Sequence, residues 1–492
     1  MVNNLAFKQN AILVNATDIK KDEVKWCSVS LTEVITTGKR LEATVFDVEL
    51  KNAKRMLENS KYPLVYVGGK SGLVTSYRPG ICKRIFVQNA QNNIPMFTPS
   101  QITDIFPKSE KYLSSKMKDS IGNWFVKEGE LLLTCSGTIG KTTIVTRTLR
   151  NKCFSQNMIR ICPKNKVDLG YLYCFFNSKI GQLILTRNNY GAVIQHIDPS
   201  HLEAIQVPNP PMSMKDKMSD LILSSFKLRD ESNELIDKAT NMLIQELNLP
   251  PIQKFKVDRF DKGADVVTFS VALSEIRGRV DASFHVPITK AIVEHLKLNA
   301  KEVTIVGDDR ISKQVILPGR FKRVYVEEGQ GRVFFGGKQL NELDPTNKKY
   351  LSDKAHSMRI KKELEILENT ILVSRSGTIG KIAMAPKHWE HWIASDHIIR
   401  IVPSSKNIAG YLTIFLSTDY GYELIKRFTY GSVVDEIDDK QVSQIEVPLL
   451  KNAEIQAEIN ALSLEANAKR FEAYKLEQKA MGIMDNEVIF AK

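Results

Sequence analysis

The hexapeptide SGTIGK occurs twice in this chain, at residues 136–141 and again at residues 376–381, 240 residues further on. The same offset continues without a gap as far as Val207-Pro208 and Val447-Pro448, and the segments IRI and GYL recur on the way. Upstream the two copies still match, with small shifts in the offset. PGICKRIFV (79–87) corresponds to PGRFKRVYV (318–326), and KYLS (111–114) corresponds to KYLS (349–352). A match of this length indicates a duplication. Its period is too long for a solenoid repeat, so each copy is expected to be a whole domain.

Each copy mixes strand and helix signals. LLLTC and TILVS read as strands that end at the glycine corner, and TTIVT and KIAMA read as the return strands. The glycines of SGTIGK are then explained by the positive φ that a tight corner requires. Segments such as LGYLYCFFN have helical spacing of apolar residues, and a short strand containing Val-Pro closes each copy. We therefore predict an α+β domain in each copy, with a core of its own.

The glycine corner also invites a nucleotide-binding interpretation. A phosphate-binding P-loop needs a glycine, four residues, and then Gly-Lys-Ser/Thr. Counting back from Gly140-Lys141-Thr142, the required first glycine falls on Cys135. Gly137 lies only three residues before Gly140, so a loop that starts there is too short to wrap a pyrophosphate. In the second copy Ile382 follows the lysine, so the hydroxyl that would bind Mg²⁺ is missing. The spacing therefore argues against an ATPase or a GTPase.

A long helical segment follows each copy. Residues 212–248 contain neither proline nor glycine and place three leucines at seven-residue intervals: Leu221, Leu228 and Leu235. The second segment carries Ile455, Leu462 and Leu476 on one heptad position, and Ile459, Ala466, Ala473 and Ala480 on the complementary one. Apolar heptads predict coiled-coil helices, and an alanine row lets a partner helix approach closely. About 34 residues at about 1.5 Å rise give a rod of about 50 Å.

These signals divide the chain into four parts. We expect a first domain over residues 1–211, a central helix over 212–250, a second domain over 251–450 and a C-terminal helix over 451–492. The formal net charge of +13 favours a polyanionic partner or an acidic protein partner. The sequence has no run of about 18 or more apolar residues, so no membrane span is indicated. The polar N-terminus, MVNNLAFKQN, lacks an apolar signal segment, so a cytoplasmic location is expected.

The order domain, long helix, domain, long helix, with SGTIGK in each domain and a Val-Pro strand before each helix, resembles the specificity subunit of type I restriction–modification systems. The resemblance covers essentially the whole chain. It implies two target recognition domains, each reading one half of a split, asymmetric DNA site. It also implies that the helices form an antiparallel coiled coil, which sets the half-site spacing, relates the domains by a pseudo-two-fold axis and docks methyltransferase subunits.

The partners that the resemblance implies are double-stranded DNA, methyltransferase subunits (two of them) and, in the full phage-defence complex, restriction subunits. It implies no catalytic, cofactor-binding or metal-binding residue in this chain. S-adenosylmethionine, ATP and Mg²⁺ are expected on the partner subunits. The alternative is a stand-alone tandem-domain DNA-binding regulator, and copurification with a methyltransferase would decide between the two.

Three local patterns could suggest other chemistry. NPPM (209–212) resembles the Asn-Pro-Pro-aromatic motif of amino methyltransferases, but Met212 replaces the aromatic ring that stacks on the flipped base. The HWEH segment (388–391) could suggest a metal site, yet its first-copy counterparts are not ligands, so a partly buried aromatic loop is expected. Lys440, after Asp438-Asp439, loosely resembles a nuclease motif, and we interpret it as a solvated turn.

Basic residues at equivalent positions of the two copies are candidates for contacts with DNA phosphates, because phosphate contacts set affinity and register without carrying sequence information. The candidates are Lys83, Arg84, Lys141, Lys322, Arg323 and Lys381. Two different half-sites demand different side chains. Base readout is therefore expected where the two copies differ.

Overall fold

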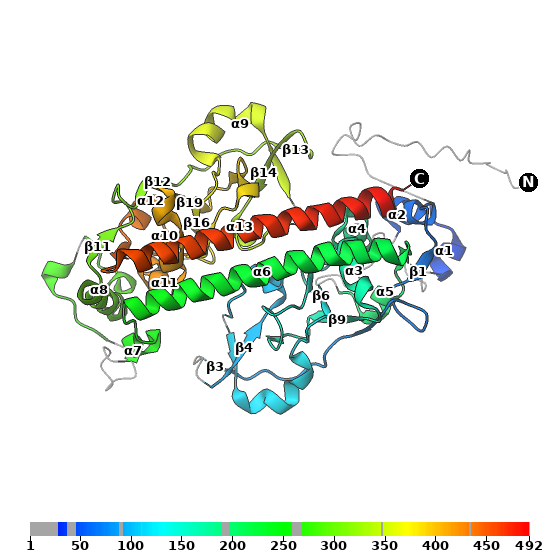
Figure 1. The fold of residues 1–492 in the computed structure, drawn as a ribbon, viewed down its shortest axis with the longest axis horizontal. Coiled ribbons are helices and arrows are strands. Elements are labelled where there is room, and N and C mark those ends of the chain that lie inside the picture. Colours follow the sequence, from blue (N-terminus) through cyan, green and yellow to red (C-terminus); the bar gives the residue numbers. More distant parts are fainter. Residues whose placement is uncertain are drawn as a thin grey trace, which may run out of the picture.

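A computed structural model of the chain describes residues 28–36, 46–87, 92–109, 111–187, 196–257, 268–276, 278–345, 348–431 and 434–491. Two long helices, α6 (Met212–Glu246) and α13 (Ala453–Ile483), lie side by side through the middle of the molecule (Figure 1). They are antiparallel, because Lys238 near the end of α6 pairs with Glu458 near the start of α13. One α+β domain lies on each side of this helix pair (Figure 1). The expected fold class and antiparallel arrangement are confirmed.

The elements of the first domain are α1 (Leu31–Thr36), α2 (Val48–Glu58), β1 (Leu64–Tyr66), β2 (Val74–Tyr77), β3 (Phe86–Val87), β4 (Ile94–Phe97), β5 (Lys111–Leu113), β6 (Leu131–Thr134), β7 (Thr142–Ile144), β8 (Cys153–Phe154), β9 (Met158–Pro163), α3 (Lys166–Asn177), α4 (Lys179–Arg187), α5 (Pro199–Glu203) and β10 (Gln206–Pro208). Helix α6 follows directly.

The elements of the second domain are α7 (Ile252–Val257), α8 (Pro287–Asn299), β11 (Glu302–Ile305), β12 (Ser312–Ile316), β13 (Tyr325–Val326), β14 (Gly331–Phe335), β15 (Lys349–Ser352), α9 (Asp353–Arg359), β16 (Ile371–Ser374), β17 (Ile382–Met384), β18 (Ile393–Ala394), β19 (Ile398–Pro403), α10 (Lys406–Ser417), α11 (Asp419–Lys426), α12 (Asp439–Ser443) and β20 (Glu446–Leu449). Helix α13 follows, and a π-helical turn, Met484–Ile489, continues it.

The strand order is the same in both domains. A two-stranded sheet pairs β1 with β10 in the first domain and β11 with β20 in the second. One four-stranded sheet has the order β2-β9-β6-β7, matched by β12-β19-β16-β17. The other has the order β3-β5-β4-β8, matched by β13-β15-β14-β18. The duplication seen in the sequence is therefore a duplication of the whole topology.

The repeated GYL segment explains how each domain docks on its own long helix. Gly170 lies in α3 and Gly410 in α10, and both helices are buried along most of their length. A Cβ at Gly170 would lie 2.4 Å from the Cα of Ser219 in α6, and one at Gly410 would lie 2.3 Å from the carbonyl oxygen of Asn460 in α13. No side chain larger than hydrogen fits these positions. The glycines let the two helix backbones touch.

The seam between α6 and α13 has one larger residue at the start of each row and small residues along the rest. On α13 the buried row is Ile459, Ala466, Ala473 and Ala480, as the alanine spacing predicts. On α6 the equivalent buried row is Met218, Ser225, Ser232 and Ala239, each 241 residues earlier. The Ser225 hydroxyl donates a 2.8 Å hydrogen bond to the carbonyl oxygen of Ala473. A side-chain bond to a backbone group of the opposite helix requires close axes, which the small residues permit.

The leucine row that the sequence indicates on α6 reaches the domain cores. Leu221 is partly buried against the core of the first domain, and Leu235 against the core of the second. On α13, Ile455 and Leu462 likewise pack against the second domain. Leu228 and Leu476 are partly buried beside them. The physical reason is that both rows repeat every seven residues. Larger apolar side chains of the leucine row reach the domain cores, and the Ser225 hydroxyl bonds across the two helices at Ala473.

Each domain core is completed by the helix end of the other copy. The end of α13 contributes Ala480, Ile483 and Met484 to the core of the first domain. In the same way, Ala239 and Leu243, near the end of α6, lie in the core of the second domain. The packing unit is therefore larger than either predicted sequence segment. Neither domain encloses its core alone, contrary to the expectation from the repeat.

Candidate nucleic-acid interface

An equivalent edge segment in each domain presents basic and aromatic side chains together. These edge segments are residues 83–87, which end in β3, and 322–326, which end in β13; both strands lie at the edge of a four-stranded sheet. Lys83 and Lys322 are exposed. The exposed rings of Phe86 and Tyr325 each lie beneath a lysine from the neighbouring strand.

The lysine over each ring comes from the repeated KYLS motif. The Lys111 ammonium lies 5.9 Å from the centre of the Phe86 ring, and the Lys349 ammonium lies 5.5 Å from the centre of the Tyr325 ring. Both lysines are exposed, so their charge remains available to solvent or to a phosphate. Positive charge combined with exposed rings is a typical footprint of nucleic-acid binding.

The two arginines of these segments are held inside their own domains. Arg84 donates a 2.7 Å hydrogen bond to the Gln156 side chain, and its guanidinium lies 5.7 Å from the Trp124 ring. Arg323, its equivalent, pairs with Asp396 and lies 5.2 Å from the Phe334 ring. These contacts attach the two edge segments to the interior of their own domains. The exposed candidates are therefore Lys83 and Lys322, and Arg84 and Arg323 serve to position them.

The glycine corner has the backbone conformation that the sequence predicts. It joins β6 to β7 with Gly137 at φ +76° and Gly140 at +94°, and it joins β16 to β17 with Gly377 at +75° and Gly380 at +78°. In the first domain the corner rests on α4, where Gln182 donates a 2.8 Å hydrogen bond to the carbonyl oxygen of Gly140. SGTIGK is thus a tight corner, and the positive φ of its glycines accounts for its presence in both copies.

The lysines of the two corners lie in different surroundings. Lys141 forms an ion pair with Glu342 of the second domain and donates a 3.2 Å hydrogen bond to the Thr103 hydroxyl. Lys381 is partly buried, and within the described residues its ammonium has neither an ion pair nor a hydrogen bond. Of the two, only Lys381 keeps an unpaired charge. Lys141 joins the two domains instead.

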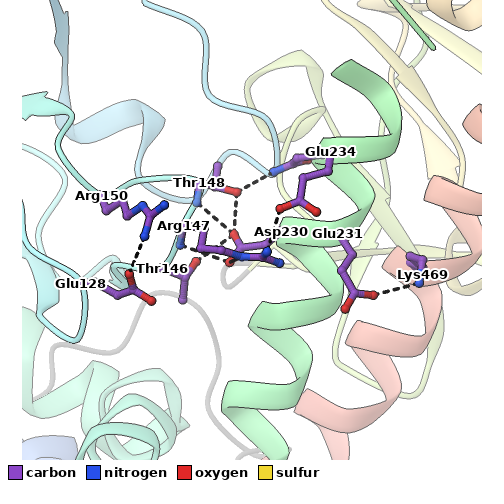
Figure 2. Close-up of polar contacts among 10 residues, drawn as sticks. Glu128, Thr146, Arg147, Thr148, Arg150, Asp230, Glu231, Glu234 and Lys469 are labelled. Carbon is purple, nitrogen blue, oxygen red and sulfur yellow. Dashed lines mark hydrogen bonds and ion pairs between the residues drawn. The ribbon is translucent and has the colours of Figure 1, made fainter. Parts of the chain in front are cut away.

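A charged groove separates the first domain from α6 (Figure 2). Asp230 lies at its base, only 4% exposed, and accepts hydrogen bonds from Thr146 Oγ1 at 2.9 Å and Thr148 Oγ1 at 2.6 Å. Arg147 reaches Glu234 at 2.9 Å, and Lys469 of α13 reaches Glu231 at 2.9 Å. The carboxylates of the groove are thus already paired within the chain. These contacts hold the loop 146–150 against α6.

The equivalent contact in the second domain is aromatic. His388 occupies the position of Thr148, and its ring stacks on Tyr474 and on Phe471 of α13 with interplanar angles of 9° and 11°. His388 also bonds through Nε2 to the carbonyl oxygen of Leu343 at 2.8 Å. Burial lowers the pKa of His388 to about 4, so the ring is neutral near pH 7. The expected partly buried aromatic loop is confirmed.

The other patterns considered from sequence also have structural explanations. NPPM is the turn between β10 and α6, and Met212 is the first residue of that helix. Asp438 caps α12, where its carboxylate accepts a 2.8 Å hydrogen bond from the backbone nitrogen of Gln441. Among the described residues no group of His, Cys, Asp and Glu could hold a metal ion. In the same part of the chain, no helix combines the length and apolar character needed to cross a bilayer.

Sequence reasoning missed several residues of this surface. Lys111 and Lys349 lie in a motif that is identical in both copies, so the shared-position rule could have selected them. The sequence did not identify Phe86 and Tyr325 as exposed residues, because a strand normally buries its aromatic side chains. Glu342 carried no sequence signal, because its partner Lys141 belongs to the other domain.

The family model described as "Type I restriction modification DNA specificity domain" matches residues 81–241 and 331–462, more than half of the chain. A curated relative, the type I restriction enzyme MjaVIII specificity subunit of Methanocaldococcus jannaschii, is 26% identical over 155 residues. That match covers 28% of this chain and 34% of the relative, so it spans about a third of the relative's length.

Solved structures also match most of this chain. The S subunit of a type I restriction–modification system from M. genitalium is 13% identical, with a TM-score of 0.32, and the match covers 87% of this chain and 95% of that one. The HsdS subunit of Thermoanaerobacter tengcongensis is 12% identical, with a TM-score of 0.26, and covers 87% and 100% respectively.

Proposed function

Since this chain belongs to the family of type I restriction–modification DNA specificity domains, we propose that it selects the DNA site of such a system. Each domain reads one half of a bipartite site, and the paired helices hold the two readers apart. The observation that carries the proposal is the pseudo-two-fold arrangement of two domains with one topology. Symmetric readers bind half-sites whose spacing follows from the protein geometry.

The half-sites are expected to differ, because the two domains share their framework and differ on their surfaces. The edge segments keep Lys83 and Lys322 at equivalent exposed positions, which suits phosphate contacts. The aromatic rings of the same edge segments differ, Phe86 in one domain and Tyr325 in the other. The target is therefore asymmetric, with unspecified bases between its halves.

The chain supplies recognition, and the chemistry is assigned to partners. Two methyltransferase subunits would bind along the helix pair and carry S-adenosylmethionine. Restriction subunits would add ATP- and Mg²⁺-dependent cleavage in the full complex.

The test is methylation mapping. The chain is coexpressed with its methyltransferase partner in a host that lacks other methylation, and modified bases are read by long-read sequencing. We expect one split, asymmetric motif with a fixed gap. A continuous motif, or full methylation activity of the partner without this chain, would overturn the proposal. Failure of the chain to copurify with the methyltransferase would favour a stand-alone regulator.

A further inference from the structure

Two equivalent loops, here called the inner loops, meet at the centre of the molecule. The first inner loop is QITDIFP, residues 101–107, and the second is QLNELDP, residues 339–345. Each begins at the last residue of a single 3-10 turn, Pro99–Gln101 in one domain and Gly337–Gln339 in the other. The side chain of that last glutamine accepts a hydrogen bond from the backbone nitrogen of Thr98 at 3.0 Å in the first turn and of Gly336 at 3.3 Å in the second. The shared glutamine therefore holds both loops in the same way where they begin.

The inner loops pair through residues at equivalent positions. Asp104 and Glu342 form an antiparallel β-bridge, and the backbone nitrogen of Ile105 donates a 2.8 Å hydrogen bond to the carbonyl oxygen of Asn341. Asp104 and Glu342 are themselves equivalent residues of the repeat. A contact in which a residue meets its own counterpart lies on a two-fold axis. The inner loops thus touch on the pseudo-two-fold axis between the domains.

A buried ion pair reinforces this contact. Glu342 is only 5% exposed and pairs with Lys141 from the glycine corner of the first domain. The Thr103 hydroxyl donates a 3.1 Å hydrogen bond to the same carboxylate and accepts one from Lys141 at 3.2 Å. A buried carboxylate that loses its only cation is strongly destabilised. The interaction therefore favours the arrangement in which the domains touch.

Both inner loops are also fastened to the helix pair. The Asn233 side chain of α6 donates a 2.8 Å hydrogen bond to the carbonyl oxygen of Ile105. Gln478 of α13 donates a 3.1 Å hydrogen bond to the Asp344 carboxylate. Lys108, just after the first loop, donates a 2.7 Å hydrogen bond to the carbonyl oxygen of Ser417, at the end of α10. The contact joins both domains and both long helices.

We propose that the inner loops form a brace, centred on Lys141 and Glu342, that fixes the gap between the two DNA half-sites. This inference rests on the proposed function. Two packed helices about 50 Å long resist stretching, but they bend and twist, and long helices in proteins are rarely straight. Bending moves the domains relative to each other. A domain-to-domain contact on the symmetry axis removes that freedom, so the helix pair and the brace together determine the gap.

The test compares gap preference rather than activity alone. The full-length chain carrying Lys141→Met with Glu342→Gln is coexpressed with the methyltransferase partner, and methylation is mapped as for the wild type. Glu342→Gln keeps the acceptor for Thr103 and leaves no charge buried alone. We expect the two half-sites to be unchanged, and the preference for the native gap over gaps one base pair longer or shorter to fall about fivefold, equivalent to roughly 1 kcal/mol.

The repeat supplies a matched control. Lys381→Met is the same substitution at the equivalent corner of the second domain, where no described residue forms an ion pair or hydrogen bond with the ammonium. Whatever it does to affinity, it should leave the gap preference at the wild-type value. A milder variant, Glu342→Asp, keeps the charge but shortens the side chain to that of Asp104. It should relax the gap by an intermediate amount, and it decides the matter if circular dichroism shows the double variant to be unfolded.

The outcomes separate the two proposals. A wild-type protein that yields no split motif would overturn the proposed function. A wild-type split motif with an unchanged gap preference in the folded variants would overturn the brace alone. Folded variants that lose methylation at every gap would also overturn the brace, because the ion pair would then serve assembly. A gap preference relaxed in the variants and retained in Lys381→Met supports it.

Discussion

The rings of His388 and Tyr474 stack with their centres 4.0 Å apart and their planes 9° apart. Their equivalents in the other half are Thr148 and Asn233, which also touch, through a 3.1 Å hydrogen bond from the amide of Asn233 to the hydroxyl of Thr148. The same joint between domain and helix is therefore polar in one copy and aromatic in the other. The duplication has kept the position of this contact and has changed its chemistry.

The aromatic joint predicts a pH dependence of stability. Burial lowers the pKa of His388 to about 4 from an unfolded value of 6.5, so the folded state holds the ring neutral. Stability from this group is complete above pH 6.5 and is lost as the pH falls towards about 4. The full effect is about 3 kcal/mol. In the His388→Phe variant the melting temperature should fall less than in the wild type when the pH is lowered from 6.5 to about 4. An equal fall in both proteins would exclude His388 as the cause.

Charge reversal at the edge segments should weaken DNA binding without changing the sequence recognised. The structure limits this experiment to Lys83 and Lys322, because reversal at Arg84 or Arg323 would break internal contacts. Each lost phosphate contact should lower the slope of log affinity against log salt by about 1. The measurement is fluorescence anisotropy across a salt series. Lys479→Glu, exposed on α13, is the control, and an equal change in that variant would show a general charge effect.

The identity of the helix seam can be tested with two neighbouring substitutions on α13. Ala473→Leu would insert a large side chain where the Ser225 hydroxyl approaches the backbone, and it should destabilise the protein by about 1–3 kcal/mol. Leu476→Ala removes a partly buried side chain of the leucine row and should cost about 1 kcal/mol or less. Urea unfolding measures both. A larger loss from Leu476→Ala would assign the seam to the leucine row.

A domain exchange should succeed only when the helix end is exchanged with it. Replacing residues 1–208 by residues 251–448 puts a second-domain core against Ile483 and Met484, which belong to the first. Replacing 480–489 by the equivalent residues 239–248 restores the match. The repaired hybrid should be soluble and methylate a near-palindrome of the second half-site, whereas the unrepaired one should aggregate. Methylation at the original first half-site would show that recognition is not modular.

The repeat, the glycine corner and the two long helices could be predicted from the sequence because each depends on local residue preference. Gly137 and Gly140 adopt the positive φ that a tight corner requires. The alanine row of α13 was also recognisable, because small side chains at heptad spacing suit close helix packing. The topology then follows from the duplication, because two copies of one sequence fold alike.

Contacts between distant segments could not be predicted. On α6 the rows through Leu221 and Ser225 have the same period, and periodicity alone does not say which row meets a helix and which meets a domain. The pairing of Lys141 with Glu342 depends on where the symmetry axis passes, which no single segment encodes. A lysine in a glycine-rich turn therefore looked like a phosphate ligand.

The exchange of helix ends has an evolutionary consequence. One half of this chain, a domain followed by its helix, leaves its own core open and presents a helix end that fits the core of another copy. Such a half would be stable only as a homodimer. The present chain thus has the form of that dimer fused into one gene. Fusion frees the two halves to mutate separately, which turns a symmetric ancestor into a protein with two different faces.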